Sequence, residues 1–377
     1  MSVIGSSLSE VSAETWVAAA LVGEQFEFDQ LGASEIDRVV QTAVEHGVAS
    51  LLYHELSPLT SWADYPAEFR DGLTRPARQA MALDLLREED LGPLLDQLAA
   101  DGIRYLLIKG AGLAHSHYPQ SFLRERCDTD ILFPDQATFE RAWTLLESLG
   151  YQRKATLSGE FVGYQHCCWR ELVTGVHQVL DCHIKINDYL FYADTFGFDE
   201  LMEHSVSIPQ LAQTARTLDP VHALLLACMH RVATIPISNA DRLIWLFDMY
   251  LLAESFDDDE WQRFLQLAAE RSICGSCKHS LDAANEFFPL AVPDEIKAGL
   301  EQGAASEAFK PGAEMKRWQY YAQVFKSTRG VGNKTRLIRE HFLPSADYLM
   351  EKYQTRNRLA LPFLYVHRVF AGLKRYF

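Results

Sequence analysis

The sequence predicts an α+β protein in which a small mixed β-sheet lies between helical N- and C-terminal regions. Short apolar runs, partly β-branched, fall between residues 104 and 186, whereas apolar residues on both sides recur every three or four positions. At 377 residues the chain is too long for one ordinary core, so we expect two or three packed units. The predicted units are an N-terminal helical region at 1–88, a sheet-containing core at 89–215 and a C-terminal helical domain at 216–377.

The N-terminal region is predicted to consist of helices. Residues 13–22 and 36–56 carry apolar residues at helical spacing, and the connections are punctuated by Pro58, Pro66 and Pro76. Proline lacks a backbone N–H and is disfavoured inside a helix, so each proline is expected to mark a break.

The core is predicted to open with a helix over 91–100 and a buried strand over 104–109. This strand ends at the glycine turn 110–113, where backbone N–H groups can face outward at the start of a helix. A second strand is predicted over 128–133.

Further along the core, Asp135 is the predicted N-cap of a helix over 136–149. Residues 161–171 and 176–186 flank Leu172-Val173-Thr174-Gly175, a pattern that predicts a hairpin.

The C-terminal domain is predicted to be helical from Asp219 onward, with amphipathic segments at 221–232, 243–253 and 261–269. The last helix, 365–377, mixes basic and apolar residues. Such a helix can lie on an anionic membrane or pack its apolar stripe on the rest of the domain, and we favour packing.

Asp128 and Asp130 are the most informative residues of the chain. Carboxylates at i and i+2 of a strand project from the same face and repel each other unless a cation, a proton or water lies between them. A divalent cation such as Mg²⁺ prefers such oxygen ligands. Asp181 and His183 share a face of a later apolar strand, so Asp181 is the third candidate ligand. His183 orients a site group, acts as a base near the acceptor, or is a hydrogen-bonded core residue.

The glycine turn is the candidate phosphate site, because backbone N–H groups at Gly110 and Gly112 can hold an anion. Lys109 ends the strand before it and either meets a phosphate or reaches solvent. Arg124 lies four residues before the first aspartate, where it either neutralises the carboxylate pair or binds phosphate, or else is an ordinary surface arginine.

Other polar residues give weaker signals. His115 and His117 are two residues apart on a predicted helix and point in different directions, so they are not expected to share a metal. His230, Arg242 and Asp248 either line a cleft or are satisfied buried groups.

The chain resembles bacterial proteins of the uncharacterised nucleotidyltransferase family, within the polymerase-β-like superfamily. The matching stretches are Leu107 to Leu113, Arg124, Asp128 to Phe133, Leu180 to His183, His230, Arg242 to Asp248 and Phe342 to Ser345. The chain departs from the usual pattern at three places, with Lys-Gly-Ala-Gly at 109–112 for Gly-Ser, Thr129 for an apolar residue and Ile184 for Trp.

The resemblance implies a metal-dependent nucleotidyltransferase that transfers an NMP from an NTP such as ATP to a hydroxyl group and releases pyrophosphate. It implies Asp128, Asp130 and Asp181 as catalytic ligands of Mg²⁺ or Mn²⁺. The residues implied to hold the nucleotide are Lys109, Gly110, Gly112, Arg124 and His183.

Composition limits the partners. The net charge of −16 provides no basic footprint for nucleic acid, so a small molecule, peptide or protein is the expected acceptor. The N-terminus lacks a signal-peptide pattern and no apolar stretch is long enough to be a transmembrane segment, which predicts a cytoplasmic protein. Seven cysteines, an odd number, indicate reduced thiols, and the single Cys-x-x-Cys at 274–277 lacks the second pair of a structural zinc site.

Two other functions fit the same pattern less well. A non-catalytic nucleotide-binding or partner-binding module would be indicated by loss of a carboxylate, and all three are present. A metal-dependent phosphohydrolase usually needs further His and Asp ligands, and the one His-x-His falls on a predicted helix.

Overall fold

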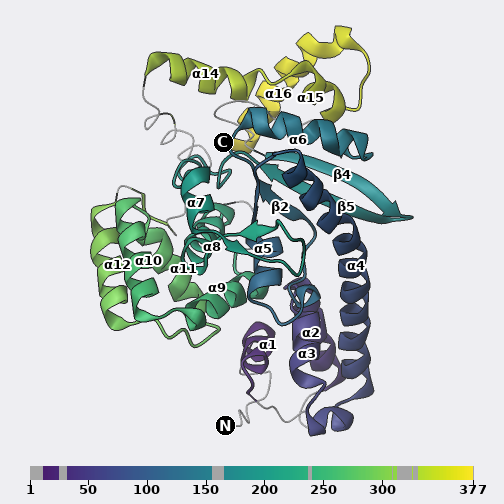
Figure 1. Cartoon of the computed structure of the whole chain (residues 1–377), viewed down its shortest axis with the longest axis vertical. Helices are drawn as coiled ribbons and strands as arrows, with labels where there is room; N and C mark the ends of the chain where they lie inside the picture. The colour runs from purple at the N-terminus through teal and green to yellow at the C-terminus, as the bar shows by residue number, and fades with distance from the viewer. Residues whose placement is uncertain are drawn as a thin grey trace.

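The computed structural model describes residues 12–24, 32–154, 165–236, 240–307, 309–311, 325 and 330–376. It has the predicted α+β architecture, with a seven-stranded mixed sheet and helical regions at both ends of the chain. Figure 1 shows the N-terminal helices at one end, the long α4 (Ala67–Ala100) along one side of the sheet, the helices of residues 220–306 on the other side, and the last helices at the opposite end.

The N-terminal region is helical, as predicted, but its breaks differ from the prediction. Its elements are α1 (Ala13–Leu21), α2 (Ala33–Glu45), α3 (Ala49–Leu56), η2 (Thr60–Asp64) and α4 (Ala67–Ala100). The segment predicted as one helix at 36–56 is split between α2 and α3 at Gly47, whose φ is +71°.

The prediction that Pro76 marks a connection is wrong, because this proline lies inside α4. Pro66 is the N-cap of the same helix. At 34 residues, α4 runs from the N-terminal helices onto the sheet and crosses the proposed boundary between residues 88 and 89. The division into three units therefore stays a prediction.

The sheet has the strand order β3-β4-β5-β2-β1-β7-β6. Its strands are β1 (Leu106–Ile108), β2 (Thr129–Leu132), β3 (Gln152–Arg153), β4 (Gln165–Val173), β5 (Val176–His183), β6 (Val206–Ser207) and β7 (Arg216–Thr217). The predicted hairpin is formed by β4 and β5 and turns at Gly175, whose φ is +79°. Part of its first predicted strand, 161–164, lies outside the described residues.

The register at the centre of the sheet brings the predicted carboxylates together. Strands β1 and β2 are antiparallel, with Ile108 opposite Asp130. Strands β2 and β5 are parallel, with Asp130 opposite Asp181 and Leu132 opposite His183. Since directly paired residues point to the same face, Asp130 and Asp181 are neighbours on one face of the sheet.

Helices connect and cover the strands. The connecting elements are α5 (Lys109–Ser116), η3 (Ser121–Leu123), α6 (Gln136–Ser148) and α7 (Phe198–His204). After the sheet come α8 (Pro220–Thr234), α9 (Leu243–Ser255), α10 (Asp258–Glu270), α11 (Cys274–Asn285) and α12 (Asp294–Ser306). The last described elements are α14 (Val331–Phe342), α15 (Ala346–Lys352), η4 (Arg358–Ala360) and α16 (Leu361–Tyr376). No helix in the described part of the chain is long and apolar enough to cross a membrane.

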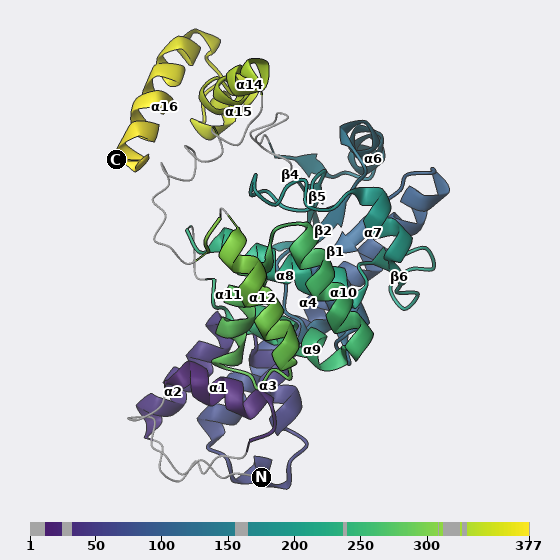
Figure 2. The same ribbon diagram turned by 90° about the vertical axis from the view of Figure 1, so that its left-hand side faces the viewer.

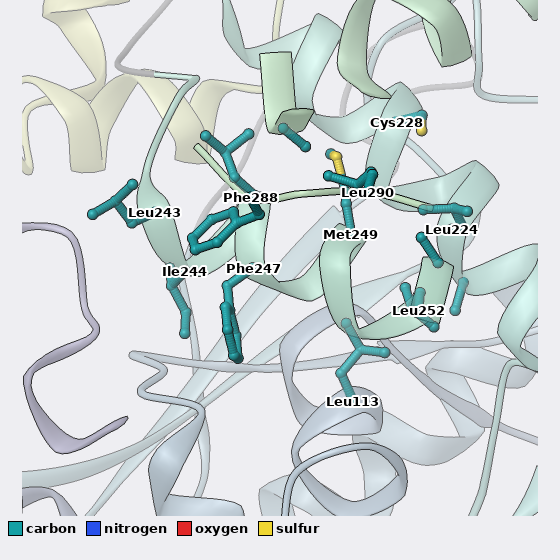
Figure 3. Close-up of a cluster of buried hydrophobic side chains, with 14 of the residues drawn as sticks. Leu113, Leu224, Cys228, Leu243, Ile244, Phe247, Met249, Leu252, Phe288 and Leu290 are labelled. Atoms are coloured by element: carbon teal, nitrogen blue, oxygen red, sulfur yellow. The ribbon is translucent and has the colours of Figure 1, made fainter. Parts of the chain in front are cut away.

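The buried side chains form two cores on either side of the sheet. One core joins the sheet to α6 and the second half of α4, with Leu95, Phe139 and Leu180 among its members. The other core joins the N-terminal helices to α5 and α8–α12. Figure 3 shows this second core where Leu113 of α5 lies near Leu252 of α9. Because α5 also contacts α8, the segment that follows β1 is held against the C-terminal helices.

Candidate active site

A cavity of about 780 Å³ opens where the sheet centre meets α4, α8 and α9. All of the predicted site residues except Gly112 and His183 line it, and His183 hydrogen-bonds to a lining residue. The polar and charged lining residues are Gln79, Asp84, Arg87, Lys109, Arg124, Glu125, Arg126, Asp128, Asp130, Gln165, Asp181, Asp188, Thr217, His230, Thr234, Arg242 and Asp248.

Asp130 is the most enclosed carboxylate of the cavity. It lies on β2 between β1 and β5, and only 7% of the residue is exposed. Its Oδ1 accepts a hydrogen bond from Lys109 Nζ at 2.7 Å and another from His183 Nε2 at 2.9 Å. Burial by itself raises the pKa of a carboxyl, but Lys109 and His183 hold the pKa of Asp130 well below its usual range. Asp130 is therefore a permanent negative charge.

The two contacts of His183 Nε2 determine its tautomer. Lys109 has only N–H donors, so its 3.4 Å approach would require a lone pair on Nε2. The shorter contact with Asp130 requires a proton there, and a carboxylate is the better partner. We assign the proton to Nε2, so His183 orients Asp130. Its Nδ1 is buried without a hydrogen-bond partner among the described residues and lies 3.8 Å from Asp188 Oδ1.

Asp181 stands beside this pair on β5. An oxygen of Asp181, one of Asp130 and a ring nitrogen of His183 all lie within 4.8 Å of one another, the spacing of a shared metal ion. Burial, together with Asp128 and Asp130, raises the pKa of Asp181 to about 6. Gln165 on β4 donates a hydrogen bond to Asp181 Oδ2. This crowding of carboxylates is relieved by a cation, and the oxygens of Asp130 and Asp181 suit Mg²⁺ or Mn²⁺, with His183 as the donor that orients Asp130.

Asp128 occupies the position directly before β2 and is half-buried. Burial and the neighbouring Asp130 raise its pKa above the ordinary value. It is not a member of the compact Asp130–Asp181–His183 group. Its place in the metal site therefore stays a prediction.

The predicted glycine turn is the first turn of α5. Lys109 begins the helix with φ +53°, a left-handed conformation that costs energy in a residue with a side chain. Burial opposes its charge, but Asp130 raises the pKa of Lys109. In this structure its ammonium binds Asp130, so contact with a phosphate requires the side chain to turn.

The two glycines allow close packing. A Cβ on Gly110 would lie 3.3 Å from Arg124 Cζ, and a Cβ on Gly112 would lie 2.0 Å from Thr217 Oγ1. Gly112 therefore brings α5 against β7, whereas Gly110 lines the cavity beneath a guanidinium.

Arg124 forms a buried, bidentate ion pair. Its Nε donates to Asp248 Oδ1 at 2.8 Å and its Nη2 to Asp248 Oδ2 at 2.7 Å. Tyr118 also donates to this carboxylate, at 2.7 Å. The interpretation of Arg124 as a surface arginine is wrong, because the residue is buried and its ion pair with Asp248 joins the segment before β2 to α9.

His230 and Arg242, the other two residues that were expected either to line a cleft or to be satisfied buried groups, also line the cavity. His230 packs edge-on against Trp245, and burial together with Lys109 lowers its pKa to about 3. The Arg242 guanidinium stacks on Trp245, 5.3 Å from the ring centroid, and makes no ion pair or hydrogen bond with the described residues. Burial and nearby Arg124 lower the pKa of Arg242, so an anion bound there would be stabilised.

Several cavity residues were missed from the sequence. On α4, Leu83 and Arg87 share one face with Pro76 and Gln79, and helical spacing could have revealed this if Pro76 had not been predicted to mark a break. Other missed residues are Asp84, Arg126, Gln165 and Asp188. Arg126 pairs with Asp84 at 2.7 Å, an interaction between distant segments that spacing does not reveal.

The histidine pair and the cysteine pair noted in the sequence both lie in the described part of the chain. His115 lies 3.5 Å from Glu88, His117 bonds Ser116, and neither belongs to the metal-compatible group. Cys274 and Cys277 are buried free thiols on α11.

Comparison with known protein families gives a match over most of the chain. A protein-family model described as uncharacterised nucleotidyltransferase matches residues 32–289, which is more than half of the chain and includes every residue of the cavity. No curated protein matches the sequence significantly.

Proposed function

Because the chain belongs to the uncharacterised nucleotidyltransferase family, we propose that it transfers an NMP from an NTP to a hydroxyl group of a small molecule, peptide or protein, with release of pyrophosphate. The observation that carries the proposal is the pairing of Asp130 with Asp181 across two parallel strands at the cavity wall. Paired acidic residues of this kind suit phosphoryl chemistry that depends on a divalent metal.

Asp130 and Asp181 would hold Mg²⁺ or Mn²⁺, with Asp128 as the third carboxylate. When bound, the metal would neutralise charge on the phosphates and on the entering and leaving oxygens. The fit rests on the oxygen donors within 4.8 Å and on the raised pKa of Asp181, to which burial and the neighbouring Asp128 and Asp130 contribute. His183 would keep Asp130 in the orientation that presents its carboxylate to the cavity.

Asp181 is the proposed proton acceptor for the acceptor hydroxyl. Without a metal, burial and the neighbouring Asp128 and Asp130 raise its pKa to about 6, so the carboxylate is ionised at neutral pH and able to accept a proton. Gln165 holds its Oδ2, which leaves Oδ1 for the proton.

The nucleotide phosphates are proposed to bind at the start of α5. Lys109 and the backbone N–H groups near Gly110 face this side of the cavity, and Arg242 offers a guanidinium without a carboxylate partner among the described residues. Trp245 and His230 add aromatic surface beside it. The proposed acceptor is not a nucleic acid, since the net charge of −16 opposes a polyanion.

A second candidate is a nucleotide-binding module without catalysis. The ion pair between Lys109 and Asp130 favours it, because the lysine ammonium stands where a metal would contact that oxygen. The two candidates differ in whether nucleotide is consumed.

The test is mass spectrometry of the purified protein and candidate acceptors after incubation with each NTP and Mg²⁺ or Mn²⁺. We expect an acceptor mass increased by one NMP, with pyrophosphate formed in equal amount. Asp130→Asn should abolish the product, whereas Asp194→Asn, at an exposed carboxylate outside the cavity, should leave it unchanged.

Calorimetry separates the two candidates. NTP binding that depends on Mg²⁺ and on Asp130, without product from any acceptor, would support the non-catalytic module. Labelled nucleotide on RNA or DNA, with small-molecule and polypeptide acceptors unmodified, would contradict the proposed acceptor class.

A further inference from the structure

One side of the last helix presents large apolar side chains to solvent. Phe363, Val366 and Phe370 are spaced by three and four residues, so they lie on one face of α16, and Leu359 is on η4 immediately before this helix. Their exposed fractions are 73%, 54%, 63% and 90% in that order. We call these four residues the outer face of α16.

The orientation of α16 is fixed by contacts of its opposite side. Tyr365 donates a hydrogen bond to the Pro344 carbonyl at 2.7 Å, and Arg368 lies over the ring of Tyr348 on α15. The neighbouring Leu349 is fully buried. The expectation that the helix packs its apolar stripe on the domain is therefore wrong for the outer face, because a different side of α16 makes the packing contacts.

The described part of the chain has few other exposed apolar residues of this size. Nine of its fifteen exposed large hydrophobic residues lie between 325 and 370, and the other six occur earlier in the chain, where only Met81 and Leu85 are within one helical turn of each other. A concentration of exposed apolar residues of this kind marks a surface that contacts a membrane or another protein. Figure 2 shows α14–α16 projecting beyond the sheet, with α16 away from the body of the molecule.

The charge of this segment is opposite to that of the rest of the chain. Residues 330–377 contain nine Lys and Arg against three Asp and Glu, a net charge of +6 in a chain of −16. Arg356 and Arg358 are exposed immediately before Leu359. Exposed aromatic residues on a helix that is flanked by arginines match the combination that binds anionic lipid headgroups and the apolar boundary beneath them.

We propose that α14–α16 bind the surface of an anionic phospholipid membrane through the outer face of α16. Phe363, Val366 and Phe370 would enter the boundary between headgroups and acyl chains, while Arg356 and Arg358 would contact lipid phosphates. The catalytic body carries the negative charge of the chain, so it would face away from the membrane.

Vesicle flotation with the full-length protein tests this proposal. The protein should float with vesicles of phosphatidylcholine mixed with phosphatidylglycerol, and not with phosphatidylcholine alone. Phe363→Ser/Phe370→Ser should weaken binding roughly a hundredfold, because two aromatic side chains no longer leave water. Arg356→Gln/Arg358→Gln should weaken it roughly thirtyfold at low salt and less at high salt.

Met81→Ser/Leu85→Ser is the matched control, since it removes two exposed apolar residues from α4 outside the cavity. It should bind vesicles as the parent protein does. Absence of vesicle binding by the parent would overturn the proposal. So would a dimer, detected by light scattering, that the Phe363→Ser/Phe370→Ser variant dissociates while no protein floats, since the face would then join two copies of the chain. Circular dichroism of each variant would verify that α-helical content is retained.

Discussion

At Asp130, a lysine ammonium and a histidine N–H meet a single carboxylate oxygen. A buried carboxylate is costly without such partners, and the same partners determine how the cavity receives a cation. Lys109 is the flexible member of the group, because its side chain is 20% exposed whereas the His183 side chain is fully buried. The competition between Lys109 and a metal for Asp130 is therefore open to a direct test.

Lys109→Met should destabilise the metal-free protein by about 3–5 kcal/mol, because Asp130 loses its charged partner. The variant should gain more thermal stability from Mn²⁺ than the parent does, since the metal no longer competes with an ammonium. Its affinity for NTP should fall roughly tenfold to a hundredfold through loss of a phosphate contact.

Thermal unfolding with and without Mn²⁺, and calorimetry with NTP, measure these effects. Lys185→Met is the control, because Lys185 pairs with exposed Asp194 outside the cavity. Equal stabilisation by Mn²⁺ in the parent and in Lys109→Met would show that the lysine and the metal do not share a site.

The Arg124–Asp248 ion pair gives a second prediction at this scale. Both side chains are buried, so removing either charge leaves the other unpaired. Arg124→Gln and Asp248→Asn should each lower the free energy of unfolding by about 3–5 kcal/mol. The double variant should lose much less than the sum, because no unpaired charge remains.

Urea unfolding measures this cycle. Arg104→Gln, which breaks an exposed pair with Asp199, should change stability by less than about 1 kcal/mol. Additive losses for Arg124 and Asp248 would show that the pair is not coupled in solution.

At the scale of elements, the contact between α5 and β7 places the start of the helix beside the cavity. Thr217 Oγ1 donates to the Leu107 carbonyl at 2.9 Å and occupies the space that a side chain at 112 would need. This close approach requires glycine, although nothing in the local helical pattern demands it. Gly112 thus acts through packing, and Lys109 and Gly110 are the residues of the turn that line the cavity.

Gly112→Ala should lower the free energy of unfolding by about 1–3 kcal/mol, because the added methyl group overlaps Thr217. Thr217→Ala in the same chain should recover part of this loss by removing the overlapping hydroxyl. Gly332→Ala is the control: nothing lies within 4 Å of the added Cβ, so helix propensity should make the change neutral or slightly stabilising. Chemical denaturation measures the free energy of unfolding of the three variants. A Gly112→Ala protein as stable as its parent would contradict the packing argument.

At the scale of the whole molecule, neutral buried histidines link stability to pH. Burial lowers the pKa of His115 to about 4, and burial with the nearby Arg153 lowers that of His166 to about 4. In the unfolded chain both rings take up protons near pH 6.5. Between pH 6.5 and pH 4 the unfolded state therefore binds more protons than the folded state, so the free energy of unfolding falls as the pH is lowered through this window.

Lowering the pH from 7 to 5 should therefore destabilise the protein, by no more than about 2 kcal/mol for each histidine. Urea unfolding at the two pH values measures the loss. His115→Gln should show a smaller loss than the parent, and exposed His177→Gln should show the same loss. A loss in His115→Gln equal to that of the parent would exclude His115 as a source.

The sequence alone determined the α+β class, the strands around Asp130 and Asp181, and the helices on both sides, because hydrophobic spacing reports which face of an element is buried. Local chemistry also determined single features, such as the cap of α6 by Asp135, whose side chain accepts from Thr138 N–H. Asp128, Asp130 and Asp181 could be identified as candidate site residues because charged residues are unexpected within runs of apolar strand residues. These are properties of neighbouring residues in the chain.

Only the tertiary structure decided which charges meet. It joined Arg124 to Asp248 across 124 residues, placed Lys109 on Asp130, and brought a face of α4 to the cavity. It also left the outer face of α16 exposed although that helix is amphipathic. Spacing shows that a residue is on a buried or exposed face, but the partner of a buried charge depends on strand register and helix packing, and both are set by contacts between segments that lie far apart in the chain.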